Sequence, residues 1–175
     1  MPTLKLHLPE ELLTEENKED LLQFVNKEIS EKDKQFKDLT SWMRAVLRNY
    51  AAGAMQTFRQ WKSTGTVGAP DRKIITLARD RLWQGDGIDV LEDGLEGKEY
   101  PLTIGGLQYE YLKNAVAWEN TYQHEVLKSE LEHKNVARLA QYLITSTLLQ
   151  LQREIDEEKM SVEEEKLTEN TGKAD

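Results

Sequence analysis

The sequence contains no cysteine, which excludes disulfide bonds, thiolate metal sites and cysteine nucleophiles. Only 4 of its 175 residues are proline, which fits a folded helical protein. No segment approaches the roughly 18 apolar residues that a membrane-spanning helix needs. The N-terminus also lacks the apolar stretch of a signal peptide. These absences predict a protein that has no membrane partner and works in the cytoplasm.

The remaining composition is typical of one folded domain. Apolar residues make up 38% of the chain and charged residues 31%, and the length suffices to bury a core without metal or disulfides. We expect an all-α fold, a helical bundle of about five helices over residues 1–160. Residues 161–175 lack apolar periodicity and are acidic, which predicts a disordered tail.

Apolar residues recur at spacings of three and four in five segments, each of which predicts a helix. The expected helices cover Pro9–Ile29 and about 36–62, 72–83, 107–131 and 134–158. Leu4, Leu6 and Leu8 alternate with polar residues, which indicates a short extended segment before the first helix. Residues 85–106 hold six of the ten glycines and many acidic residues. They predict a long irregular acidic loop, with room for a small hairpin around 100–104.

The net charge of −9 conceals a strong partition along the chain. Residues 34–83 carry ten basic and three acidic side chains, whereas the segments on either side of this stretch are net acidic. A helical wheel at about 100° per residue places five of the basic side chains within roughly 60° of arc, away from the aromatic-rich apolar stripe. This cationic face consists of Lys37, Arg44, Arg48, Arg59 and Lys62.

The cationic face would span about 37 Å of one helix, from Lys37 to Lys62. Ala51, Ala52 and Met55 are expected in its middle, where they would let a partner approach closely. Four basic residues of the expected third helix could widen the face: Arg72, Lys73, Arg79 and Arg81.

A line of arginines suits a polyanion, because guanidinium groups donate bidentately to phosphate and keep their charge. The sequence therefore favours a nucleic-acid partner, contacted at its backbone and without sequence preference. Two other interpretations stay open. The face could bind an acidic protein, or it could be a solvated surface that pairs with the chain's own acidic loop.

Other candidate motifs do not fit their chemistry. An EF-hand register from Asp89 would place Leu91 and Tyr100 at ligand positions, and His124-Glu125 is not followed by the second histidine of a zinc protease. Gly65 and Gly68 lack the lysine of a phosphate loop. We expect no metal, no cofactor, no small-molecule substrate and no catalytic residue.

A helical protein of this size with a cationic helical face resembles the small subunits of CRISPR Cascade-type effector complexes. The resemblance covers about residues 36–158, depends on the basic residues named above, and is architectural, without a diagnostic motif. It implies a non-catalytic subunit of an antiviral defence complex, which contacts DNA strands by their backbones and binds other protein subunits. The alternative is a protein-only adaptor or assembly chaperone whose basic helix docks an acidic partner.

Overall fold

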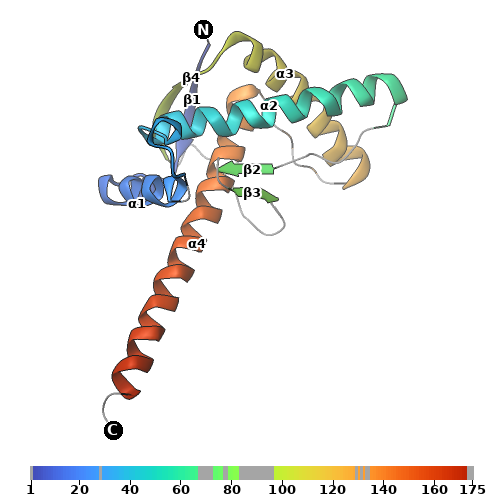
Figure 1. The fold of residues 1–175 in the computed structure, drawn as a ribbon. Coiled ribbons are helices and arrows are strands. Elements are labelled where there is room, and N and C mark those ends of the chain that lie inside the picture. Colours follow the sequence, from blue (N-terminus) through green and yellow to red (C-terminus); the bar gives the residue numbers. More distant parts are fainter. Residues whose placement is uncertain are drawn as a thin grey trace.

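The computed structural model describes residues 2–27, 29–66, 73–76, 79–82, 97–128, 130, 132 and 135–172, with the backbone alone described at 73–76, 79–82 and 169–172. Within these ranges the chain is mainly helical, as the sequence predicts, and carries two small antiparallel sheets (Figure 1). The helices are α1 (Glu15–Asn26), α2 (Leu39–Thr64), α3 (Gly106–Thr121) and α4 (Val136–Gly172). The strands are β1 (Thr3–Leu8), β2 (Lys73–Thr76), β3 (Arg79–Leu82) and β4 (Lys98–Thr103). Short helical turns are η1 (Glu10–Leu12), η2 (Lys32–Lys34) and η3 (Tyr122–Val126).

The alternating leucines of the N-terminus form β1, which confirms the expected extended segment. Leu4, Leu6 and Leu8 are all buried. β1 pairs with β4 in an antiparallel register that sets Thr3 opposite Thr103. The predicted local hairpin around 100–104 is therefore wrong. The strand found there, β4, pairs with β1, which lies about 95 residues earlier in the chain.

The first helix begins later than predicted. Pro9 precedes only the 3₁₀ turn η1, and α1 begins after Thr14, whose hydroxyl accepts a hydrogen bond from the N–H of Asn17 at 3.2 Å. A threonine side chain can satisfy a free N–H of the first turn, which proline cannot do. Glu15 and Glu16 then lie in the first turn, where the helix dipole favours negative charge.

The second helix is the element that the sequence predicts best. Asp38 caps α2 by accepting a hydrogen bond from the N–H of Ser41 at 2.7 Å, and Gly65 ends the helix at a φ of 74°. The buried side of α2 includes Trp42 and Leu47, both fully inaccessible to solvent. The helix begins at Leu39 rather than near residue 36, because the residue before it supplies the cap.

The expected third helix over 72–83 is wrong. The backbone forms β2 and β3 instead, with Lys73 opposite Leu82 and Thr76 opposite Arg79. Consecutive β-branched residues at 74–76 favour a strand, and only two residues separate the paired segments. The acidic loop predicted over 85–106 lies mostly outside the described residues, and its last part forms β4 and the start of α3.

The last two helices complete the core. α3 packs against α2, while the first half of α4 packs against β1, α2 and α3. Trp118 of α3 and Ile144 and Leu148 of α4 are fully buried. α4 continues to Gly172 and its second half projects beyond the other elements (Figure 1). The structure thus has a helix over 161–172 where a disordered tail was expected, since residues such as Glu, Lys and Leu favour helix without any buried face.

Candidate nucleic-acid interface

Four residues of the predicted cationic face lie on one uninterrupted helix. α2 is 26 residues long and contains four basic residues and no acidic one. Arg44, Arg48, Arg59 and Lys62 are all exposed. From the first to the last of them α2 rises by about 27 Å at 1.5 Å per residue. The helix therefore presents separated positive charges with no negative charge of its own between them.

The guanidinium of Arg44 is held at the N-terminal end of the cationic face. Its Nε donates a hydrogen bond to the backbone carbonyl of Thr103 at the end of β4, at 2.9 Å. This bond uses one of the five N–H groups of the guanidinium and leaves the others for a partner. Arg44 is therefore positioned by the fold without its charge being neutralised by this contact.

Lys62, at the C-terminal end of the face, lies against aromatic rings. Its Nζ is 4.8 Å from the ring centre of Trp61 and 5.3 Å from that of Phe58. The two rings meet edge to face, with centres 6.0 Å apart. Such cation–π contacts orient an ammonium group and preserve its charge.

The chain's own carboxylates engage other lysines. Among the described residues, ion pairs join Lys5 to Glu99, Lys18 to Glu15, Lys34 to Glu31, Lys113 to Glu110, Lys159 to Asp20 and Lys27 to Glu158. Within the same part of the chain, no ion pair includes a member of the cationic face. Pairing of this face with the acidic loop stays an open interpretation, because most of that loop lies outside the described residues.

One carboxylate, that of Asp38, influences the N-terminal end of the face. Hydrogen bonds from the N–H and hydroxyl of Ser41 lower the pKa of Asp38, and the positive charges of Arg44 and Lys37 lower it further. Because the folded-state pKa is depressed, this carboxylate stabilises the fold above its unfolded pKa of about 3.9, and the contribution is lost as pH falls through the folded value. Asp38 also partly offsets the positive potential of the face.

Replacing Asp38 with asparagine is expected to strengthen nucleic-acid binding about two- to fivefold at low salt, because an interaction between exposed charges is worth up to about 1 kcal/mol. Asparagine also caps a helix well, so the melting temperature should fall only slightly, by the loss of the charge interactions of the carboxylate. Fluorescence anisotropy with a labelled duplex measures the affinity. The exposed Glu16→Gln change on α1 is the control and should leave it unaltered. Equal affinities of the two variants would contradict an effect of Asp38 on the face.

Two details of the predicted face need correction. Lys37 is exposed but precedes α2, because Asp38 is the cap residue. Ala51, expected in the middle of an open line, is fully buried, although the wheel places it within about 20° of Arg44. The cationic face therefore lies along the edge between the exposed and the buried sides of α2. The buried Ala51 separates its basic residues into two groups, one at each end of the face. Arg44 and Arg48 form one end, and Arg59 and Lys62 form the other.

Three of the four residues expected to widen the face lie on strands. Lys73 belongs to β2, and Arg79 and Arg81 belong to β3, for which only the backbone is described. Arg72 lies outside the described residues. β2 lies beside α2, so its chain position is close to the face, whereas the part that these four side chains play stays a prediction.

The N-terminal pair of arginines, Arg44 and Arg48, borders a groove that was not predicted from the sequence. This α2–α3 groove has a volume of about 470 Å³ and is lined by Arg44, Leu47 and Arg48 of α2 and by residues 103–105 and 108. Gly105 is the residue that precedes α3, and no side chain caps this helix. One sequence signal could have indicated the groove: the Gly105-Gly106 pair comes directly before an apolar helical pattern. These two glycines fall within the acidic loop predicted over 85–106.

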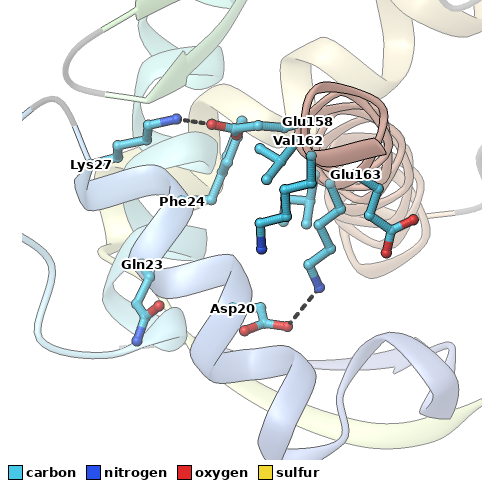
Figure 2. Close-up of a pocket in the computed structure, with 10 residues that line it drawn as sticks. Asp20, Gln23, Phe24, Lys27, Glu158, Val162 and Glu163 are labelled. Atoms are coloured by element: carbon cyan, nitrogen blue, oxygen red, sulfur yellow. Dashed lines mark hydrogen bonds and ion pairs between the residues drawn. The ribbon is translucent and has the colours of Figure 1, made fainter. Parts of the chain in front are cut away.

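A second cleft, between α1 and α4, differs in its charges. It has a volume of about 610 Å³ and its walls include Phe24, Lys27 and Glu158. Figure 2 shows that Lys27, the residue after α1, meets Glu158 of α4 across one end, and a second ion pair joins Lys159 to Asp20 at 3.3 Å. Because charges of both signs face each other here, this cleft is a junction between helices and a weaker candidate for binding a polyanion.

The described part of the chain has no cluster of three or more histidine, aspartate or glutamate residues placed to bind a metal ion. None of its helices has both the length and the apolar character required to cross a membrane. Comparisons with models of protein families, with curated proteins and with solved structures gave no match for this chain. The functional proposal below therefore depends on the geometry of the described residues.

Proposed function

We propose that the protein is a non-catalytic subunit of a nucleoprotein complex that holds nucleic acid by its phosphate backbone. The observation that carries this proposal is a continuous helix, α2, with exposed Arg44, Arg48 and Arg59 and no acidic residue. Contacts of this kind are independent of sequence and weaken as salt rises, because each neutralised phosphate releases condensed counterions. A CRISPR effector complex of the Cascade type is the assembly that we propose on the basis of the resemblance.

The net charge of −9 is compatible with this proposal, because negative and positive charges occupy different parts of the molecule. Between Asp156 and Gly172 the sequence holds seven acidic and two basic residues. That half of α4 projects away from the elements that surround α2 (Figure 1). Over distances greater than about 8 Å, physiological salt screens the repulsion between exposed charges and a bound polyanion.

The proposal is tested by the affinity of the purified protein for labelled duplex DNA, duplex RNA and single strands of two unrelated sequences. We expect binding that is similar for the two sequences of each type and that falls steeply with salt. Absence of binding at about 50 mM salt would refute backbone recognition.

A protein-only adaptor or assembly chaperone is the second candidate, and the projecting half of α4 favours it. Met160 and Leu167 are exposed there, at 61% and 66% of their accessible surface, while Val162 lines the α1–α4 cleft. Large apolar side chains on a protruding helix suit contact with another protein. Purification from native cells separates the candidates. Nuclease-sensitive material that absorbs at 260 nm indicates a nucleoprotein subunit, whereas a stoichiometric acidic protein without nucleic acid indicates an adaptor.

A further inference from the structure

The α2–α3 groove brings two guanidinium groups to one small concave surface. Arg44 and Arg48 are one helical turn apart on α2, and both border the groove. Leu47 and Ile104 line it between them and are buried, which gives the groove an apolar floor. Both arginines are exposed, so the groove brings their charges together at a surface that an anion can reach from solvent.

The two arginines are differently prepared for a ligand. The hydrogen bond from Arg44 Nε to the carbonyl of Thr103 fixes the guanidinium beside the groove. Arg48 is exposed, and no hydrogen bond or ion pair of its side chain is found within the described ranges. One guanidinium is therefore pre-positioned, and the other can move onto a bound group at the cost of its own rotamer freedom.

Backbone N–H groups face the same region from α3. The first hydrogen bond of this helix runs from the N–H of Tyr109 to the carbonyl of Gly105, so the N–H groups of residues 106–108 precede the helical ladder. The first turn contains no acidic residue, and no side chain caps Gly105. A Cβ added to Gly106 would meet no atom within 4 Å, whereas one at Gly105 would collide with the side-chain amide of Gln108. A group that binds at the helix start on the groove side therefore has to displace the flexible end of Gln108.

The carboxylates around the groove are engaged elsewhere. Asp38 caps α2 and lies near Arg44, and Glu110 of α3 pairs with Lys113 at 3.6 Å. The α1–α4 cleft, in contrast, contains two ion pairs of its own. Of the two cavities, the α2–α3 groove is thus the one whose cations form no ion pair among the described residues, although the charge of Asp38 acts on Arg44.

We propose that Arg44 and Arg48 make the α2–α3 groove a binding site for one phosphate group, assisted by the free N–H groups at the start of α3. This inference rests on the proposed function and makes it more specific. One phosphate of the bound strand would occupy the groove, while Arg59 and Lys62 contact the backbone farther along. The groove would thereby fix the register of the protein on the strand without reading any base.

The test places a carboxylate at the start of α3, directly after Gly105, which lines the groove. Gly106→Asp puts a negative charge in the first turn of α3, where helix formation favours it and the added Cβ meets open space, so the variant should fold. Gly106→Asn is the matched control, since it has nearly the same size and no charge. Loss of one phosphate contact predicts about tenfold weaker binding of a single-stranded oligonucleotide to Gly106→Asp at about 0.1 M salt. The control should remain within about twofold of the native protein.

Inorganic phosphate provides a direct probe of the same site. In spectra of ¹⁵N-labelled protein, phosphate should shift the amide signals of residues 105–108 and the Nε signals of Arg44 and Arg48, compared with chloride at equal ionic strength. Gly106→Asp should abolish these shifts and Gly106→Asn should retain them. Absence of the shifts in the native protein would overturn the phosphate site, as would equal oligonucleotide affinity of the two variants.

These outcomes separate the groove from the wider proposal. If Gly106→Asp binds the oligonucleotide normally while loss of Arg59 and Lys62 weakens binding, the groove site is wrong and the nucleic-acid function stands. If phosphate shifts the groove amides but no nucleic acid binds the native protein, the proposed function is wrong and the anion site stands.

Discussion

Replacing Arg44, Arg48 and Arg59 together with alanine is expected to lower the affinity for duplex DNA on the order of 10²-fold at about 0.1 M salt. Each arginine that contacts a phosphate releases about 0.9 of a counterion, so the loss of three contacts removes two to three orders of magnitude at this salt concentration. The loss should be similar for unrelated sequences, because no base is read. Anisotropy titrations with two duplexes measure the effect.

A matched triple variant controls for total charge in this experiment. Replacing Lys5, Lys18 and Lys113 with alanine removes the same three positive charges from positions that pair with the chain's own glutamates, at 3.8, 3.2 and 3.6 Å. We expect its affinity to stay within about threefold of the native value. Equal losses in the two triple variants would mean that net charge and not the cationic face governs binding. Native affinity of the arginine variant would remove the basis of the proposal.

Replacing Trp42 with alanine is expected to lower the free energy of unfolding by about 3–5 kcal/mol. Trp42 lies on the buried side of α2, has no accessible surface and belongs to the main apolar core. Its removal leaves a cavity that the surrounding helices cannot fill completely. Because a domain of this size is stable by only about 5–15 kcal/mol, the variant should melt far below the native protein or fail to fold. Urea unfolding followed by circular dichroism measures the difference.

Trp61 on the same helix provides the comparison. It is half-buried, near the C-terminal end of α2, and packs edge to face on Phe58. Trp61→Ala should cost less, about 2 kcal/mol, because it loses part of a buried surface together with an aromatic pair worth about 1 kcal/mol. A similar loss of stability in the two variants would contradict the assignment of the core to the Trp42 side of α2.

Local sequence patterns predict an element when its own residues show which face is buried, whatever that face packs against. The apolar stripe of α2 and the alternating leucines of β1 are visible because one face of each is buried. The strand partner of β1 is not visible, since β4 follows it by about 95 residues and any complementary strand would satisfy the same pattern. The helical residues 161–172 were missed for the opposite reason, because residues 161–168 are all exposed and offer no buried apolar face to recognise.

The candidate site was likewise predicted only in part from the sequence. The exposure of Arg44, Arg48 and Arg59 follows from their position on the wheel relative to the apolar stripe, and the structure places all three outside the core. The burial of Ala51 does not follow, because it depends on which neighbouring element covers that edge of α2. The groove was hidden for a similar reason, as it forms only where α2 meets the start of α3, about 60 residues later.

The salt dependence of nucleic-acid affinity tests the central claim most directly. The logarithm of the association constant for duplex DNA, plotted against the logarithm of salt concentration, should fall linearly for the native protein. For the Arg44, Arg48 and Arg59 alanine variant the line should be shallower by about 2–3 units of slope. Two parallel lines, or a native affinity that does not respond to salt, would contradict backbone recognition by the cationic face of α2.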